Sequence, residues 1–133
     1  MMRSPKVDKF YLRLEFNNFM KENNMFSNEF INYLKDKTKI LGMYGWFGCF
    51  PIYDKDNKLI SIRLLIPELN SIDDLLIWIH EYTHAYELYQ NLGKTFVEDK
   101  EHSEELAVNM ENKYKQLRLI KSKKIWLYRT KVL

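Results

Sequence analysis

Residues 77–86 read IWIHEYTHAY and place the pattern His-Glu-x-x-His inside a run that carries no other charge. Two of the chain's three histidines, His80 and His84, belong to this pattern. In a helix, residues four apart lie one turn apart on the same face, so both imidazoles can point toward a shared ligand. A glutamate inside an apolar helical run is costly to bury unless something pairs with it. The run therefore predicts a buried helix with a polar site on one face.

The chemistry of these side chains favours a metal site. Imidazole nitrogens suit Zn²⁺, and a catalytic zinc site combines three protein ligands with an open position for water. A carboxylate beside that position can accept a proton from the water. We therefore interpret His80 and His84 as ligands of one zinc ion per chain and Glu81 as the general base. The alternative is a buried amphipathic helix in which neighbouring groups satisfy both histidines.

The same residues resemble the signature of the zincin metallopeptidases, whose longer pattern has uncharged residues around the two histidines. The positions that agree with it are Ile77, Trp78, Tyr82, Thr83, Ala85 and Tyr86. The resemblance implies a zinc-dependent peptidase that hydrolyses peptide bonds with a metal-activated water and with Glu81 as general base.

The size and composition predict a single domain spanning residues 1–133. An apolar fraction of 46% can fill one modest core, and a net charge of +3 is too small to indicate nucleic-acid binding by itself. The single cysteine, Cys49, excludes an internal disulfide framework. Neither a signal peptide nor an apolar run long enough to cross a bilayer is visible, so we expect a cytoplasmic protein.

The amino-terminal third predicts two helices that cover a sheet. The first is expected to begin near Pro5, with Ser4 as its cap, and to end at Asn23-Asn24. Ser27 is expected to cap a second, shorter helix that ends at the charges of residues 35–37.

A β-hairpin is predicted next. Residues 44–53 are rich in aromatic and β-branched side chains, residues 54–57 form a polar turn, and residues 58–66 alternate as a strand. Pro51 cannot donate to a ladder, so the first strand should lie at an edge. The expected core face of the second strand consists of Ile60, Ile62, Leu64 and Ile66.

Two long helices should follow. Ser71 opens a capping box for the histidine-bearing helix, which should run to about Asn91 and stop at Gly93. After a polar loop, a second helix is expected over residues 101–120. Residues 124–133 are apolar-rich and are expected to form a strand or an extended tail.

The third metal ligand should come from this second helix, since Glu87 lies too far along the axis of the first. At about 100° per residue, Glu104 lies nearer than Glu105 to the centre of the core-facing stripe, so Glu104 is favoured and Glu105 is the second choice. That stripe consists of Ala107, Met110, Tyr114 and Leu117. His102 is a further candidate.

Glu-Glu-x-Ala on a second helix, about twenty residues after the motif, is similar to the gluzincin branch and to the small single-domain minigluzincins. The resemblance implies an α+β zincin-like domain, with a small twisted mixed β-sheet packed on the active-site helix and a second helix bringing the glutamate. Many gluzincins carry Asp or Asn four residues after this glutamate, where it supports a histidine. Here Val108 follows Glu104 at that distance, whereas Asn109 follows Glu105.

The resemblance also implies a peptide or protein substrate. An extended substrate would pair with the edge strand of the hairpin, so Trp46, Phe47 and Gly48 are the predicted substrate-binding residues. Tyr128 and His102 are candidates for stabilising the oxyanion.

Two other functions compete with the peptidase. A latent or non-proteolytic zinc-binding scaffold would have the tail of residues 124–133 across its cleft. A module that binds nucleic acid or protein would use a basic surface. The residues of that surface would be Arg118, Lys121, Lys123, Lys124, Arg129 and Lys131.

Overall fold

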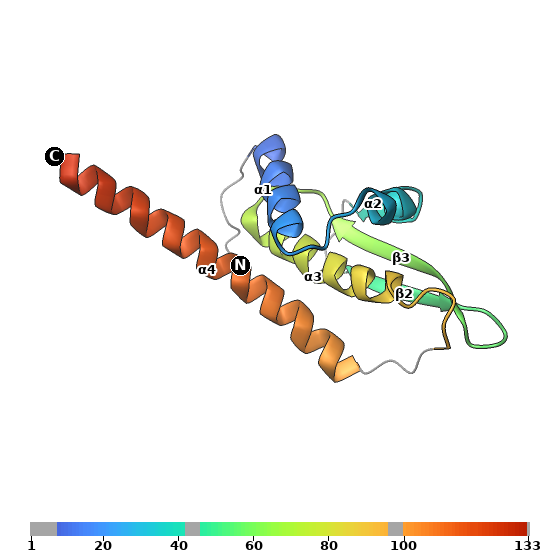
Figure 1. Ribbon diagram of the computed structural model, residues 1–133. Coiled ribbons are helices and arrows are strands. Elements are labelled where there is room, and N and C mark those ends of the chain that lie inside the picture. The colour runs from blue at the N-terminus through green and yellow to red at the C-terminus, as the bar shows by residue number, and fades with distance from the viewer. Residues whose placement is uncertain (1–7, 42–45, 96–99, 133) are drawn as a thin grey trace.

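Across the residues that it describes, a computed structural model shows the protein as an α+β fold of four helices and a small three-stranded mixed sheet (Figure 1). The structure describes the backbone of residues 8–41, 46–95 and 100–132. Side chains are described for the same residues except residue 41 and residues 120–132. The elements are α1 (Lys9–Glu22), α2 (Asn28–Lys35), β1 (Thr38–Leu41), β2 (Gly48–Tyr53), β3 (Leu59–Pro67), α3 (Ile72–Tyr89) and α4 (Lys100–Val132).

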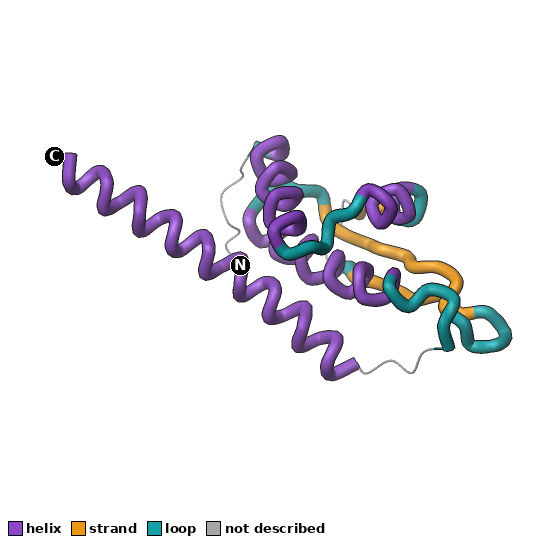
Figure 2. The backbone as a smooth tube through the Cα atoms, in the orientation of Figure 1, coloured by secondary structure: helices purple, strands orange, loops and turns teal. Residues whose placement is uncertain are grey.

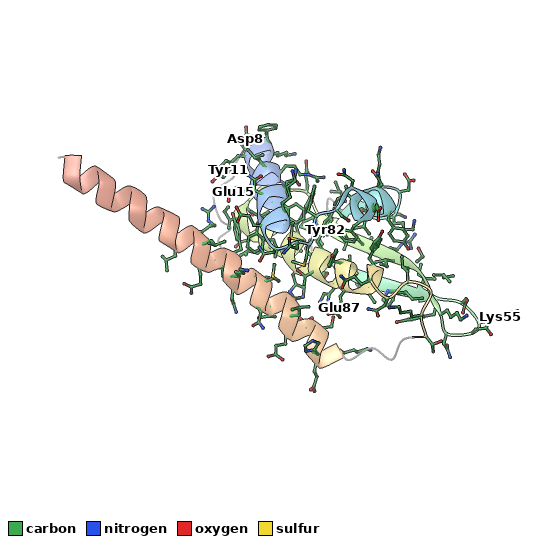
Figure 3. The ribbon with its side chains drawn as sticks, in the orientation of Figure 1. Asp8, Tyr11, Glu15, Lys55, Tyr82 and Glu87 are labelled. Carbon is green, nitrogen blue, oxygen red and sulfur yellow. The ribbon has the colours of Figure 1, made fainter. Side chains whose placement is uncertain are left out.

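The sheet has the strand order β1-β3-β2, with β3 in the centre. β2 pairs with β3 antiparallel, so the predicted hairpin is confirmed, and β2 lies at an edge as Pro51 required. Lys55 lies at the tip of this hairpin (Figure 3). β1 pairs with β3 in parallel and was not predicted. Its short run, with Lys39 inside it, has no apolar alternation to reveal a strand.

The predicted core face of β3 is wrong at one position, Ile60. Ile62, Leu64 and Ile66 are fully buried, as expected, but Ile60 is 53% exposed while Leu59 is 1% exposed. The ladder explains the difference, because Tyr53 pairs with Leu59 and the adjacent Ile52 pairs with Ser61. The extra residue on β3 forms a bulge, and a bulge shifts the alternation of side chains by one position.

Helix α3 packs along the sheet and forms the centre of the domain (Figure 2). The hydroxyl of Ser71 accepts a hydrogen bond from the backbone N–H of Asp74, which confirms the predicted cap. The helix ends at Tyr89, two residues before the predicted end. Gly93 has a φ of +79° and donates its N–H to the carbonyl of Leu59, so the chain turns back onto β3.

The first helix begins later than predicted. Asp8 is the N-cap of α1, and its carboxylate accepts hydrogen bonds from the backbone N–H groups of Phe10 and Tyr11. Ser4 and Pro5 lie outside the described residues. Ser27 caps α2 as predicted, because its hydroxyl accepts a hydrogen bond from the N–H of Phe30.

The two amino-terminal helices pack on different partners. In α1, the Phe16 ring packs edge-on against Trp78 and Tyr82 of α3, at centroid distances of 5.3 and 4.8 Å. Figure 3 shows Tyr82 between these two helices. In α2, the Phe30 ring packs against Tyr86 of α3, and the helix also contacts β3. Therefore α1 packs mainly on α3, whereas α2 packs on α3 and contacts the sheet.

Helix α4 crosses beside α3 and is longer than predicted. Its predicted inner stripe is confirmed, since Ala107 and Tyr114 are buried and Met110 and Leu117 pack partly buried against the core. The helix continues to Val132, so the prediction of a strand or extended tail for residues 124–133 is wrong. That segment contains no glycine or proline that would end a helix.

The carboxy-terminal half of α4 leaves the body of the domain and does not lie over α3 (Figure 1). Among the described residues, no helix has the length and apolar character that a membrane span requires.

Candidate metal centre

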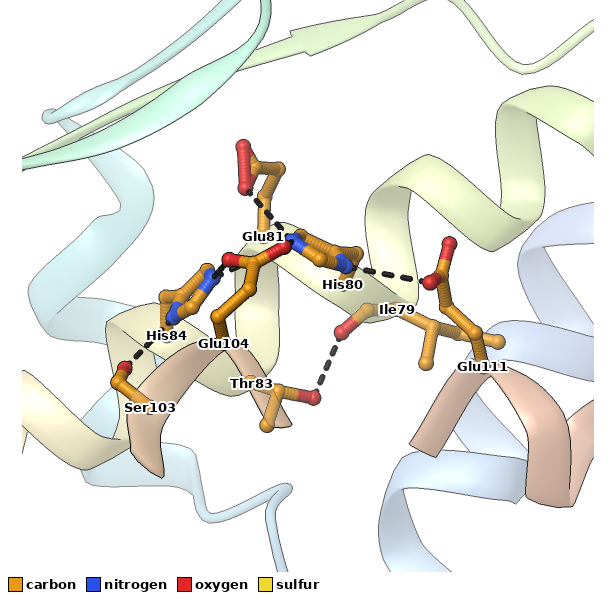
Figure 4. A network of polar contacts seen from close by, with 8 residues as sticks. All are labelled: Ile79, His80, Glu81, Thr83, His84, Ser103, Glu104 and Glu111. Carbon is orange, nitrogen blue, oxygen red and sulfur yellow. Dashed lines mark hydrogen bonds and ion pairs between the residues drawn. The ribbon is translucent and has the colours of Figure 1, made fainter. Parts of the chain in front are cut away.

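Helix α3 presents both histidines of the motif toward α4. The Nε2 atoms of His80 and His84 lie 3.2 Å apart, as expected for imidazoles one helical turn apart on one face (Figure 4). Together with Glu81 they form a group that could hold a metal ion, with one ligand atom from each within 4.8 Å of the others. Both rings are largely buried, with side-chain exposures of 19% and 17%.

Helix α4 brings the carboxylate of Glu104 onto both histidines. Its Oε1 lies 3.1 Å from Nε2 of His80, and its Oε2 lies 3.1 Å from Nε2 of His84 (Figure 4). Ala107, on the same face one turn later, is fully buried and allows the two helices to approach closely. The side chain of Glu104 is 58% exposed, so one side of this cluster is open to solvent.

The spacing of these donor atoms fits a zinc ion. Zinc binds nitrogen and oxygen at about 2.0–2.1 Å in a tetrahedron, which separates neighbouring donor atoms by about 3.3 Å. Nε2 of His80 lies 3.2 Å from Nε2 of His84 and 3.1 Å from Oε1 of Glu104, and Nε2 of His84 lies 3.1 Å from Oε2 of Glu104, so these distances are close to that separation. Two imidazoles and a carboxylate are also a donor set that zinc accepts in catalytic sites.

Glu81 lies at the wall of the same cluster with its carboxyl group buried. Its Oε1 is 3.9 Å from Nε2 of His80. The pKa of Glu81 is raised to about 7, mainly because the group is buried; the charge of His80 opposes this rise, and the carboxylates of Glu104 and Glu111 add to it. A cation between the histidines would favour the ionised form and lower this pKa. A carboxyl group tuned toward neutrality is suited to accept and return a proton.

A cleft of about 310 Å³ opens over the cluster between β2, α3 and the start of α4. Phe47 and Gly48, two of the predicted substrate-binding residues, line it together with His80, Glu81 and Glu104. Trp46, the third predicted residue, is 77% exposed and is not among the described residues that line the cleft. The cleft also has Cys49, Phe50, His84, Leu88, Lys100 and Ser103 along its walls.

Two polar contacts to the histidines were not predicted from the sequence. Nδ1 of His80 lies 3.2 Å from Oε2 of Glu111, and Nδ1 of His84 lies 2.8 Å from the hydroxyl of Ser103 (Figure 4). Glu111 comes seven residues after Glu104, which returns to the same helical face. That spacing could have identified it. Ser103 carries no comparable signal, because one serine at a helix start has many structural roles.

The other candidates for the third ligand are placed elsewhere. Glu105 is exposed and does not line the cleft; with Glu104 and Val108 it lines an adjoining surface hollow. His102 is also exposed and does not line the cleft. The Tyr128 side chain lies outside the described residues. Of the predicted basic surface, only Arg118 has a described side chain, and it donates a hydrogen bond to the hydroxyl of Tyr114.

Comparisons with known proteins identify no relative of this chain. No family model matches the chain, and neither the curated proteins nor the solved structures contain a match.

Proposed function

We propose that the protein is a zinc-dependent metallopeptidase of zincin type, with His80, His84 and Glu104 as the metal ligands. The observation that carries this proposal is the convergence of two imidazole nitrogens from α3 and one carboxylate group from α4, with each nitrogen 3.1 Å from one oxygen of that carboxylate. The open cleft beside them and the buried carboxyl group of Glu81 support an enzymatic role rather than a structural one. Structural zinc sites are usually closed by four protein ligands.

Each group has a defined role in the proposed reaction. A zinc ion held there would polarise a water molecule and lower its pKa toward neutrality. Glu81 accepts a proton from the attacking water and returns it to the leaving amine. The low exposure of the His80 and His84 side chains strengthens these electrostatic effects, because burial lowers the local dielectric constant.

The substrate in this proposal is an extended peptide. β2 is an edge strand whose first residues, Gly48 and Cys49, line the cleft above the histidines. A peptide can add to such an edge through main-chain hydrogen bonds, which would place its carbonyl groups over the cluster. The apolar side chains of Phe47 and Leu88 at the cleft wall offer contacts for neighbouring substrate side chains.

Metal removal tests the proposal directly. We expect the protein purified with zinc to cleave an unfolded protein or a mixed peptide library, to lose this activity after chelation, and to regain it when zinc is returned. The measurement is mass spectrometry of the fragments over time. Bound zinc without any cleavage would contradict the peptidase proposal and favour a non-proteolytic zinc-binding scaffold.

A further inference from the structure

In the described part of the chain, Glu111 is the one carboxylate that contacts Nδ1 of a motif histidine, the ring nitrogen that faces away from the proposed metal position. Its Oε2 lies 3.2 Å from Nδ1 of His80, on the opposite edge of the ring from Glu104. The side chain of Glu111 is 23% exposed, so water competes little for this contact. Figure 4 shows the His80 ring held between the two glutamates.

We propose that Glu111 is a positioning residue, which holds the ring of His80 at Nδ1 so that Nε2 is directed at the metal position. The geometry and chemistry of the pair support this role. A carboxylate oxygen accepts hydrogen bonds, and Nδ1 of His80 lies within hydrogen-bond distance of it while Nε2 faces the cluster. Such a carboxylate also orients a histidine ring and increases its basicity toward a metal. The inference rests on the metal site of the proposed function.

The two histidines are supported differently. Nδ1 of His84 faces the hydroxyl of Ser103 at 2.8 Å, whereas Nδ1 of His80 faces a carboxylate. An ionised carboxylate is a stronger hydrogen-bond acceptor than a hydroxyl and increases the basicity of the ring more. Glu111 should therefore affect metal affinity more strongly than Ser103 does.

Glu111 also accounts for a departure from the gluzincin pattern. Four residues after Glu104, where many gluzincins carry the supporting Asp or Asn, this chain has Val108, which is 38% exposed. A glutamate one turn further along the helix can reach the same imidazole, because its side chain is longer and leans toward the amino terminus of the helix. Asn109, which would support a site built on Glu105, is exposed.

The test compares zinc affinities by competition with a chromophoric chelator in Glu111→Gln, Glu111→Asp and two controls. We expect Glu111→Gln to bind zinc about 10–100-fold more weakly than the wild type. Glu111→Asp should lose a similar amount, because it keeps the charge and loses the reach. Asn109→Ala and Glu105→Gln should bind zinc as the wild type does. Wild-type affinity in either Glu111 variant would overturn the inference while leaving the zinc site intact.

A second readout does not depend on metal. In the metal-free protein, ¹⁵N–¹H correlation spectra of the histidine side chains should show that Glu111→Gln shifts the Nδ1 resonance of His80 and leaves that of His84 nearly unchanged. An unchanged His80 resonance in Glu111→Gln would overturn the inference, even if the protein bound no zinc. Failure of wild-type zinc binding with this shift present would instead count against the proposed function alone.

Discussion

Replacing Glu81 by glutamine should lower the rate of peptide hydrolysis by about 10²–10⁴-fold, the contribution that a positioned general base makes. Glutamine has nearly the same shape but cannot accept a proton from water at neutral pH. Because Glu81 lies beside the donor cluster and is not one of its three proposed ligands, the variant should still bind one zinc ion. The measurement is the initial rate of cleavage of a fluorogenic peptide, together with the zinc content.

Glu87→Gln is the matched control, since it makes the same chemical change on the same helix. Glu87 is not among the described residues that line the cleft, and Figure 3 shows its place on α3. We expect the rate of this variant to remain within a factor of two of the wild type. A Glu81→Gln enzyme with the wild-type rate would remove Glu81 from the mechanism, even if zinc remained essential.

The largest expected effect on stability is that of Phe16→Ala. Phe16 is 1% exposed, and its ring contacts both Trp78 and Tyr82, so it joins α1 to α3. Truncating a buried phenylalanine costs about 3–5 kcal/mol in free energy of unfolding, because the lost contacts leave a cavity. That cost is a large fraction of the roughly 5–15 kcal/mol that stabilises a typical domain.

Phe10→Ala provides the control on the same helix, because Phe10 is 78% exposed. It should change the free energy of unfolding by no more than about 0.5 kcal/mol. The measurement is urea unfolding of both variants without metal, with circular dichroism as the signal that reports unfolding. Equal free energies for Phe16→Ala and the wild type would show that α1 does not stabilise α3 in the way described.

Local sequence signals predicted the elements that hold the site. Ser71 marks the start of α3, and four-residue spacing on that helix places His80 beside His84. The apolar stripe of α4 was sufficient to orient Glu104 inward, because a helix has one period and one buried face. These predictions depend on neighbours within one or two turns, which the sequence displays directly.

Features that depend on distant pairing were missed or misplaced. β1 forms because it pairs in parallel with β3, and nothing in the sequence of residues 38–41 identifies β3 as its partner. Ile60 is exposed because a bulge opposite Ile52 shifts the register, and the shift depends on both strands. Glu111 was missed although its seven-residue spacing from Glu104 returns it to the same helical face, and its contact with His80 depends on how α4 packs against α3.

Zinc titration of four proteins tests the central claim most directly: the wild type, His84→Ala, Glu104→Gln and Glu105→Gln. Isothermal calorimetry should give one zinc ion per chain for the wild type and for Glu105→Gln. His84→Ala and Glu104→Gln should bind at least about 100-fold more weakly, because each lacks one of three protein ligands. Undiminished zinc binding in Glu104→Gln, or loss of binding in Glu105→Gln, would contradict a site formed by His80, His84 and Glu104.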